Sequence, residues 1–385
     1  MPLSRRDLLV SAPLWLAGCA ARRNDAIPPE PVPSLARVRV APERVIRTIV
    51  GLRPFRPSGF VVRGEKLGDK VVIHNYGHGG AGITLSWGTA HLALAEAATV
   101  DARHAAVIGC GVAGLSTARL LQQRGYAVRV YAKAMPPDTT SNVAGGLWLP
   151  TAVFDHERVT PEFHRQFGEA GRFAFERYQS LVGDVYAVRW LPLYWLSRDS
   201  AYRHAPPESP NSEIEPLYPD ARQLSPAEHP FDVPYVYRFY SMLIEPAIYL
   251  RALLRDFLTS KGELVVREFR EAGELASLPE RLLFNCTGLG ARDLFHDNEL
   301  IPVRGQLSFL LPQPEIDYMT TGPGDIYMFP RHDGVLLGGS HDRAVWDLKV
   351  DPVTRDRILR ENAAVFHSMR VRPGNTGTRH AVPSV

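Results

Sequence analysis

The feature of this sequence that most constrains its fold is a glycine-rich turn, GCGVAG at residues 109–114, between two apolar segments. Residues 105–108 before it have the composition of a short buried strand, and residues 115–124 after it have helical spacing. A further apolar run at 128–131 completes a strand–helix–strand unit. In such a unit the glycines permit a tight turn, a close approach of backbone to a pyrophosphate, and close packing of helix on strand. The pattern favours a Rossmann-like dinucleotide-binding domain over a plain glycine turn in another α/β protein.

The second strand of this unit ends without the acidic residue that would hold a ribose hydroxyl of NAD. Ala132 and Lys133 stand at that position instead. NAD is therefore disfavoured as the ligand. The Lys133 ammonium could suit the additional phosphate of NADP, or it could be a solvated surface group.

A second glycine cluster lies upstream, where four glycines fall within residues 77–82 ahead of a helical segment at 83–98. This arrangement predicts a glycine loop that leads into the N-terminus of a helix. A proline-rich stretch at 206–219 predicts a surface loop. Further strands are expected at residues 44–53, 71–74, 186–195, 235–240, 282–286, 303–310, 325–329 and 335–337, and a last helix is expected at 353–369.

Several segments taken together resemble the D-amino-acid oxidase family. They are VIGCGVAGLSTARLL and VYAKAMPPDTTSNVAGGLWLP from residue 107 onward, then FNCTGLGAR, RGQ, IYMFP and VLLGGS in that order. The resemblance covers nearly all of residues 45–370 and implies that the cofactor is FAD. It also implies the fold class, an α/β (α+β) protein with a Rossmann-like FAD-binding domain and a mixed-sheet substrate domain.

Two signatures of this family stand in an unexpected place. GLRPFRP at 51–57 and HNYGHGGAGITLSWG at 74–88 would come last in the family but here precede the dinucleotide motif. Each signature occurs once, so we interpret the order as a circular permutation, which one fold tolerates when the old termini lie close together. Residues 99–104 would then link the old ends. The corresponding scheme is an export signal at 1–18, a Pro-rich linker at 19–43, substrate-domain strands at 44–74, the FAD-binding domain at 75–155, mainly substrate domain at 156–280, an FAD-binding return at 281–304, substrate domain at 305–370 and a tail at 371–385.

The resemblance also implies which side chains face the substrate. Arg53 matches the family arginine that clamps the substrate carboxylate, for which a guanidinium has the right bidentate geometry. Tyr327 matches a tyrosine that hydrogen-bonds the same carboxylate, and Gly80 matches a backbone carbonyl that receives the amine. Arg331 stands where the family has a second tyrosine; it is either a cation that favours a D-aspartate or D-glutamate type of substrate or a solvent-facing arginine. Arg56 is expected to brace the turn.

The same resemblance assigns residues to the cofactor. The helix after the upstream glycine loop would direct its positive end at the flavin and favour the charge of the reduced ring. Hydride transfer needs alignment rather than a side-chain acid or base. His74 and His78 lack further ligands at metal-binding spacing, so we interpret them as hydrogen-bonding residues and expect no metal. The expected FAD-binding residues are Gly79, Gly80, Gly82, Ile83, Thr84, Gly109, Gly111, Val112, Ala113, Gly114, Thr139, Thr140, Ser141, Ala144, Gly145, Gly146, Leu147, Thr287 and Gly288.

The N-terminal segment SRRDLL, followed by an apolar run to Ala17, is typical of a twin-arginine export signal. The sequence LAGC that closes the run resembles a bacterial lipobox, which would make Cys19 the lipid-bearing mature N-terminus. The proline-rich stretch at 28–33 would form an extended spacer. We therefore expect a lipid-anchored protein on the periplasmic side of a membrane; the alternative is a chance Arg-Arg pair before an apolar segment.

The charge balance excludes one class of partner. With 44 Lys and Arg against 41 Asp and Glu, the net charge of +3 is too even for the basic surface that nucleic-acid binding requires. The expected function is oxidation of a D-amino acid to its imino acid with FAD. The sequence leaves open an FAD-dependent oxidase of glycine-like or sarcosine-like amines, a non-catalytic flavin-binding lipoprotein, and an NADP-linked reductase.

Overall fold

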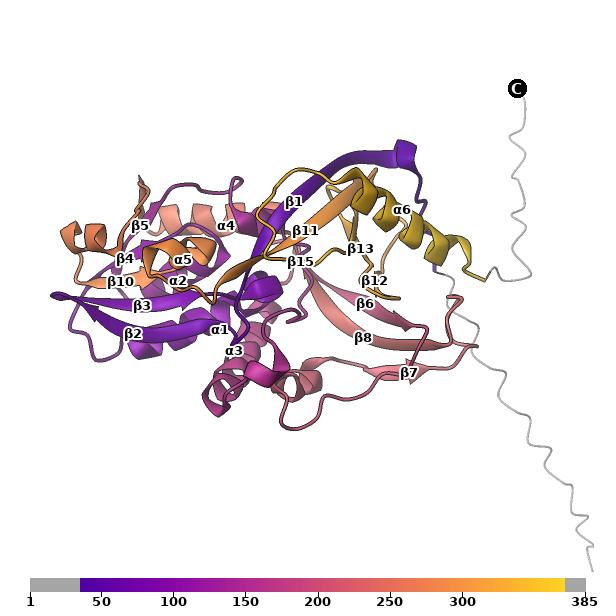
Figure 1. Cartoon of the computed structure of the whole chain (residues 1–385), viewed down its shortest axis with the longest axis horizontal. Helices are drawn as coiled ribbons and strands as arrows, with labels where there is room; N and C mark the ends of the chain where they lie inside the picture. The colour runs from indigo at the N-terminus through magenta and orange to yellow at the C-terminus, as the bar shows by residue number, and fades with distance from the viewer. Residues whose placement is uncertain (1–34, 371–385) are drawn as a thin grey trace, which may run out of the picture. The chain divides into compact units, whose positions relative to one another are not determined.

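The computed structural model describes residues 35–370, all of which fall within one compact unit. The expected export signal, Cys19, most of the Pro-rich linker and the tail at 371–385 lie outside the described residues. Two sheets organise the described part, one of six strands and one of nine (Figure 1). None of the helices described is both long enough and apolar enough to cross a bilayer.

The six-stranded sheet carries the dinucleotide motif. Five of its strands are parallel, and only the edge strand β2 runs antiparallel to its neighbour. Its inner strands are apolar on both faces, as expected for parallel strands covered by helices. In spatial order the strands are β2 (Val61–Leu67), β3 (Lys70–Tyr76), β10 (Leu282–Asn285), β4 (His104–Ile108), β5 (Ala127–Ala132) and β9 (Glu263–Val266).

The nine-stranded sheet is mostly antiparallel, with one parallel pair formed by β12 and β6. Its first two strands are paired so that Gly51 lies opposite Gly305 and Arg53 lies opposite Val303. In spatial order its strands are β1 (Val45–Phe55), β11 (Ile301–Leu310), β14 (Gly334–Gly338), β13 (Tyr327–Arg331), β12 (Met319–Thr321), β6 (Val188–Ser197), β8 (Tyr235–Ile244) and β7 (Arg222–Leu224), and β15 (Asp342–Arg343) also pairs with β11.

Helices cover both sheets. The helix after the upstream glycine loop, α1, is apolar on almost all sides and buried, because it packs between α2 and α3. Helix α6 lies against β11 and β14 of the larger sheet. The α-helices of the described part are α1 (Gly82–Glu96), α2 (Val112–Gln123), α3 (Pro161–Gln179), α4 (Pro246–Thr259), α5 (Ala291–Leu294) and α6 (Pro352–His367).

The structure divides the chain differently from the expected scheme at residues 61–74. The chain changes sheets between β1 and β2, so residues 61–74 belong to the six-stranded sheet rather than with substrate-domain strands. Within 156–280, α4 packs on α2 and β9 pairs with β5, so this segment contributes to both halves. The expected strands and helices are otherwise present within a few residues of their predicted bounds, whereas the edge strand β2 and the short strands β7, β9, β12 and β15 were not predicted.

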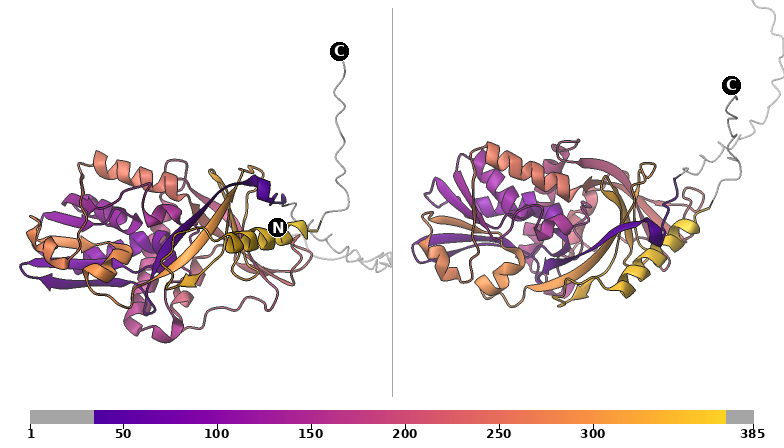
Figure 2. Two further views of the ribbon diagram at one scale, coloured as in Figure 1. Left: turned by 45° about the horizontal axis from the view of Figure 1, so that its top comes forward. Right: turned by 90° about the horizontal axis from the view of Figure 1, so that it is seen from above.

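Residues 35–40 and 366–370 lie side by side (Figure 2). Val38 is buried in the same apolar cluster as Phe366 and Met369. The hydroxyl of Tyr318 ties the first segment down by donating to the Ala36 carbonyl at 2.7 Å. A short segment also separates α1, which ends at Glu96, from β4, which begins at His104.

Candidate active site

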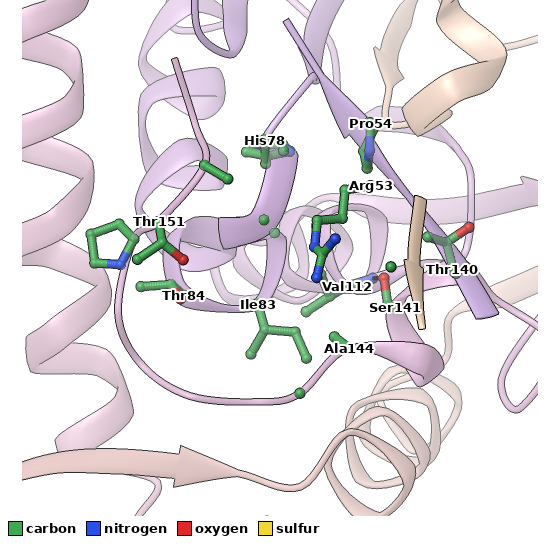
Figure 3. A pocket seen from close by; sticks show the side chains of 18 of the residues that line it. Arg53, Pro54, His78, Ile83, Thr84, Val112, Thr140, Ser141, Ala144 and Thr151 are labelled. Atoms are coloured by element: carbon green, nitrogen blue, oxygen red, sulfur yellow. Dashed lines mark hydrogen bonds between the residues drawn. The ribbon is translucent and has the colours of Figure 1, made fainter. Parts of the chain in front are cut away.

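A cavity of about 1240 Å³ lies where the two sheets meet. One end is lined by the glycine turn of the six-stranded sheet, and the other by residues of β1, β13 and the loop after β6. Both glycine-rich segments and the GLRP segment therefore border the same space. Figure 3 shows the part of this cavity where they converge.

The glycine turn before α2 forms one end of the cavity. Gly109 has a φ of +111°, and a Cβ at this position would overlap the carbonyl oxygen of Cys286. A Cβ on Gly114 would overlap the carbonyl oxygen of Gly109, so Gly114 lies behind the turn and does not line the cavity. The N-terminus of α2, which begins at Val112, faces the space that this turn borders. A helix N-terminus preceded by bare backbone is suited to bind a pyrophosphate.

The segment 139–147 passes across the front of this turn. The Ser141 hydroxyl accepts a hydrogen bond from the Val112 amide at 3.0 Å, which fixes the segment to the start of α2. At its far end Gly146 has a φ of +92° and lies against the backbone of Ile244. The segment thereby closes one wall of the cavity over the helix N-terminus.

The upstream glycine loop forms the middle of the cavity. Gly79 has a φ of +56°, and a Cβ on it would overlap the Ala152 carbonyl, to which the Gly80 amide donates at 2.9 Å. The loop therefore lies directly on the backbone of residues 151–152. Helix α1 begins immediately after it, and the Thr84 hydroxyl donates to the Leu147 carbonyl at 3.2 Å. These contacts bring α1 and the 139–147 segment together along one side of the cavity.

Arg53 extends from β1 into the cavity toward Ile83 and Val112 (Figure 3). Its Nη1 donates to the Ser340 carbonyl at 3.0 Å. On the neighbouring strand, a Cβ on Gly305 would lie 2.5 Å from the same nitrogen. The guanidinium therefore lies against bare backbone, and its position depends on the glycine of the RGQ segment.

Tyr327 on β13 lies next to this guanidinium. Burial raises the pKa of its hydroxyl, while the charge of Arg53 and a hydrogen bond with it act in the opposite direction. Its ring stacks on Phe329, with centroids 5.0 Å apart, and lies where a Cβ on Gly338 would be. The hydroxyl is therefore held rigidly, stays protonated at neutral pH and can donate a hydrogen bond beside Arg53.

Comparison with known proteins identifies the family to which the chain belongs. The model described as "FAD dependent oxidoreductase" matches residues 30–96 and 104–384, which is most of the chain. The chain belongs to this FAD-dependent oxidoreductase family. A D-amino-acid oxidase of Rubrobacter xylanophilus is 33% identical over 297 residues, which cover 73% of this chain and 83% of that protein. Human D-aspartate oxidase is 29% identical over 282 residues, or 70% of this chain and 78% of that protein.

A solved structure supports the fold. The crystal structure of glycine oxidase from Geobacillus kaustophilus superposes with a TM-score of 0.50 at 14% identity, and it covers 70% of this chain and 80% of that one. At this identity the similarity shows the fold alone. The predicted combination of a Rossmann-like domain with a mixed-sheet domain is confirmed.

The cavity of this family member fits FAD. Every predicted FAD-binding residue except Gly114 lines it, and Gly114 contributes by packing α2 against the turn. Gly111 exposes backbone beside the start of α2, and the nearest atom to a Cβ on it would be the Ser141 hydroxyl at 3.1 Å. The turn would therefore hold the pyrophosphate, and the start of α1 would lie along the flavin. The expected cofactor, FAD, agrees with the family match.

Lys133 is not a free phosphate ligand at the adenosine end of the FAD cavity. Its Nζ lies 3.3 Å from Oε1 of Glu268, which follows β9, and both residues line the cavity. A carboxylate is thus present beside the end of β5, although it comes from another strand than the fingerprint predicts. The neighbouring carboxylate makes this position less suited to the additional phosphate of NADP, and the family match favours FAD.

Arg331 is a correction to the predicted site, because it does not line the cavity. Its side chain is buried and forms a double hydrogen bond with Asp333, with both distances 2.9 Å. It also donates to the Ala144 carbonyl at 3.1 Å and lies over the ring of Phe309. With its charge neutralised in this way, Arg331 supports the wall behind the 139–147 segment and provides no second cation for a substrate.

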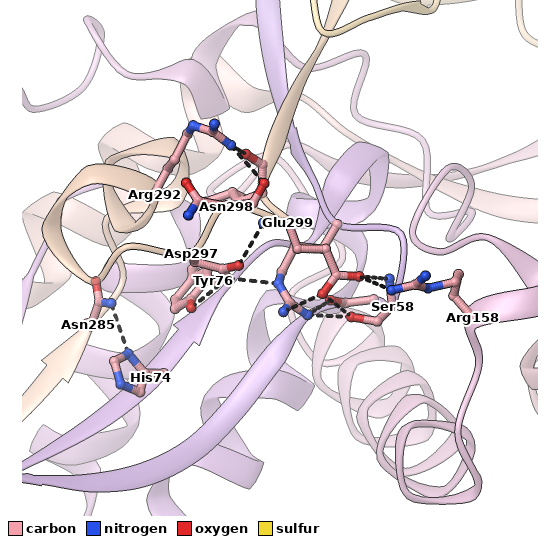
Figure 4. Close-up of polar contacts among 12 residues, drawn as sticks. Ser58, His74, Tyr76, Arg158, Asn285, Arg292, Asp297, Asn298 and Glu299 are labelled. Atoms are coloured by element: carbon pink, nitrogen blue, oxygen red, sulfur yellow. Dashed lines mark hydrogen bonds and ion pairs between the residues drawn. The ribbon is translucent and has the colours of Figure 1, made fainter.

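The predicted roles of Arg56, His74 and His78 agree with the structure, and of these three only His78 lines the cavity. Arg56 pairs with Asp297 at 2.8 Å and with Glu299 at 2.7 Å, and so braces the turn after β1, as predicted. Figure 4 labels the two carboxylate partners. His78 is buried, with its Nε2 2.9 Å from the Thr89 hydroxyl, and His74 lies 3.0 Å from the Asn285 amide. Both histidines are hydrogen-bonding residues. Within residues 35–370, no group of three His, Cys, Asp or Glu side chains is arranged as a metal site.

Sequence reasoning missed several residues that line the cavity. Trp195, Tyr202, Tyr218 and Phe239 form an aromatic wall beyond Tyr327, and His341 lies near Arg53. The aromatic side chains come from two strands and a loop that converge only in the fold. His341 directly follows the VLLGGS segment, and its proximity to a recognised signature was the one available signal.

Proposed function

We propose that this FAD-dependent oxidoreductase removes hydride from the α-carbon of a D-amino acid and releases the imino acid, which water converts to a keto acid and ammonia. The observation that supports this most is the position of Arg53 and Tyr327 in the same cavity as both glycine-rich segments. The relatives named D-amino-acid oxidase and D-aspartate oxidase support the substrate class.

Arg53 and Tyr327 would bind the substrate carboxylate. The guanidinium provides parallel N–H donors, and the neighbouring protonated hydroxyl provides a third. A charged, hydrogen-bonded pair of this kind fixes orientation as well as affinity, because a planar carboxylate fits the guanidinium in one plane. With the carboxylate fixed, the places available to the amine and the side chain decide which enantiomer directs its α-hydrogen at the start of α1.

The aromatic wall would contain the substrate side chain. Tyr202 stacks on Tyr237 with centroids 4.0 Å apart, and Tyr218 stacks on Phe239 at 4.4 Å. The Tyr202 hydroxyl donates to Glu215 at 2.6 Å, which fixes the loop that carries it. The aromatic wall favours a bulky substrate side chain over the hydrogen atom of glycine, because burial of apolar surface contributes about 25 cal/mol per Å². We therefore consider glycine-like amines less favoured substrates than D-amino acids with bulky side chains.

When bound, FAD supplies the acceptor for the hydride and its two electrons. The chain's own contribution is alignment and electrostatics. The N-terminus of α1 directs its positive end at the position of the ring, and the 139–147 segment covers the cavity on one side.

Anaerobic reduction tests the proposal. The purified yellow protein is mixed without oxygen with separate D- and L-amino acids, including aromatic and acidic side chains, and its visible flavin absorbance is followed. We expect rapid bleaching with at least one bulky D-amino acid and none with its L-enantiomer. Persistent colour with every D-amino acid would favour the non-catalytic flavin-binding alternative. Bleaching with glycine or sarcosine alone would favour the small-amine alternative.

We also propose that the chain is a circular permutation of its family's usual order. The two matched ranges meet at residues 96–104, where a short segment joins α1 to β4. The side-by-side position of residues 35–40 and 366–370 supports the same proposal, since the original order would need a short connection there. A chain re-ordered by linking residue 370 to residue 36 and opening at residue 100 should fold and bind FAD.

Export and lipid attachment at Cys19 are proposed on sequence alone. The SRRDLL and LAGC patterns support them. Fractionation of cells that express the chain should place it with membranes, and Cys19→Ser should release it. Replacement of Arg5 and Arg6 by lysine should leave the protein in the cytoplasm.

A further inference from the structure

His341 occupies a fixed position at the substrate end of the cavity. The preceding residue, Ser340, accepts the Arg53 Nη1 hydrogen bond on its carbonyl and a 2.9 Å hydrogen bond from the Gln306 amide on its hydroxyl. The following residue, Asp342, pairs with the buried Arg304 at 3.0 Å. His341 is thus held between two anchored residues, and its side chain lines the cavity. The RGQ segment supplies both anchors.

The proposed reaction leaves one step without an assigned group. An amino acid in neutral solution carries an ammonium group, whose nitrogen has no lone pair. A hydride leaves the α-carbon readily only when a nitrogen lone pair can form the C=N bond. The ammonium must therefore lose a proton before hydride transfer, and a base close to the bound carboxylate could accept it.

Several titratable groups line the cavity, including Asp325 and His156 as well as His78, whose Nε2 is already bonded to Thr89. Tyr327 has a pKa raised by burial, so its hydroxyl stays protonated and donates. Glu215 already accepts hydrogen bonds from Tyr202 and the Ala205 amide at the far wall. His341 is close enough to Arg53 for the guanidinium charge to act on its imidazole.

Resting on the proposed function, we propose that His341 accepts the proton of the substrate ammonium group while Arg53 holds the carboxylate. The N–H bond of the ammonium breaks, its electron pair stays on the substrate nitrogen, and a new N–H bond forms on the imidazole. Charge is conserved, because a neutral amine and an imidazolium replace an ammonium and a neutral imidazole. No oxidant takes part in this step.

The surroundings of His341 make its affinity for protons respond to the substrate. Partial burial of the imidazole, whose side chain is 36% exposed, lowers its pKa, and the charge of Arg53 on β1 lowers it further. Asp325, whose Oδ2 lies 3.9 Å from Nδ1, and Asp342 on β15 act in the opposite direction. Without substrate the imidazole is therefore neutral and able to accept a proton. A carboxylate bound at Arg53 offsets the guanidinium charge, so His341 becomes a better base when substrate is present.

The test compares pH profiles of anaerobic flavin reduction for the wild-type protein, His341→Gln and His367→Gln. His367 is an exposed histidine at the end of α6 and serves as the matched control. The ratio of reduction rate to substrate dissociation constant is measured between pH 6 and pH 10. For His341→Gln we expect at least a tenfold loss at pH 7 that recovers toward pH 10, where free substrate is deprotonated in solution. His367→Gln should follow the wild-type profile.

The outcomes separate this inference from the proposed function. An unchanged profile in His341→Gln overturns the inference, and so does a uniform loss at all pH values, which would indicate positioning only. Failure of the proposed function has a different signature, because the wild-type flavin would then not be reduced by any D-amino acid at any pH. Flavin content and the urea unfolding midpoint of each variant are measured alongside, and His341→Asn repeats the test if His341→Gln loses FAD.

Discussion

Substitution of Gly305 by alanine should displace the substrate clamp without disrupting the fold. The added Cβ would lie 2.5 Å from Nη1, and 2.7 Å from both Cζ and Nη2, of Arg53. These atoms form the end of a flexible side chain, so the guanidinium can move away while the β1–β11 pairing stays intact. Displacement of the guanidinium breaks its charge-assisted hydrogen bonds to the substrate carboxylate, which contribute about 1.5–3 kcal/mol each. Loss of about 2–3 kcal/mol corresponds to roughly a 30- to 150-fold decrease in kcat/KM.

Steady-state kinetics with the preferred D-amino acid, together with spectral titration with pentanoate, measures this effect. Pentanoate has a carboxylate but no amine, so its affinity reports the clamp directly. Gly273→Ala is the matched control, because no atom lies within 4 Å of a Cβ at that position. Flavin content should be the same in both variants. Pentanoate affinity in Gly305→Ala equal to wild type would refute the idea that this glycine positions Arg53.

Three further outcomes are expected. Gly109→Ala should purify without FAD, as judged by its absorbance spectrum, because the Cβ would overlap the Cys286 carbonyl and φ is +111°; full flavin content would contradict this. Arg304→Met should lower the free energy of unfolding by about 2–4 kcal/mol in urea titrations, since it removes the buried partner of Asp342 and hydrogen bonds to two carbonyls; an unchanged midpoint would contradict this. Burial lowers the pKa of His78 to about 4, below its unfolded value of 6.5. As pH falls from 6.5 toward 4, the unfolded chain therefore binds a proton at His78 that the folded chain does not, and the free energy of unfolding decreases. The contribution of His78 should make the free energy of unfolding about 2 kcal/mol lower at pH 5 than at pH 7. In urea titrations His78→Asn should show a correspondingly weaker dependence of this free energy on pH.

The parts of the site that come from contiguous segments were predictable from sequence. The turn at 109–114, the loop at 77–82 and the segment 139–147 each have short-range backbone requirements, such as positive φ at Gly109 and Gly79, that leave a pattern of glycines. Arg53 was predictable because it lies in a recognisable segment. Its supporting glycine, Gly305, has a role that only the pairing of β1 with β11 shows.

The features that were not predicted correctly failed for different physical reasons. For Arg331 the sequence left open a cation facing the substrate or a solvent-facing arginine, and neither holds, because the buried guanidinium pairs with Asp333 and donates to the carbonyl of the distant Ala144. Strand β2 was not predicted, because its second half, with Arg63 and Glu65, is polar and lies at the edge of its sheet. The aromatic wall comes from separate elements, and no local pattern marks residues that meet only after folding.

The close fit of glycines to backbone carbonyls has a consequence for redesign of the cofactor site. Gly79, Gly109 and Gly146 each lie where any side chain would collide with main chain rather than with another side chain. A compensating substitution elsewhere cannot make room at such positions. Attempts to alter nucleotide preference would therefore have to work at the rim, where the exposed Lys133 and Glu268 can be exchanged without touching the framework.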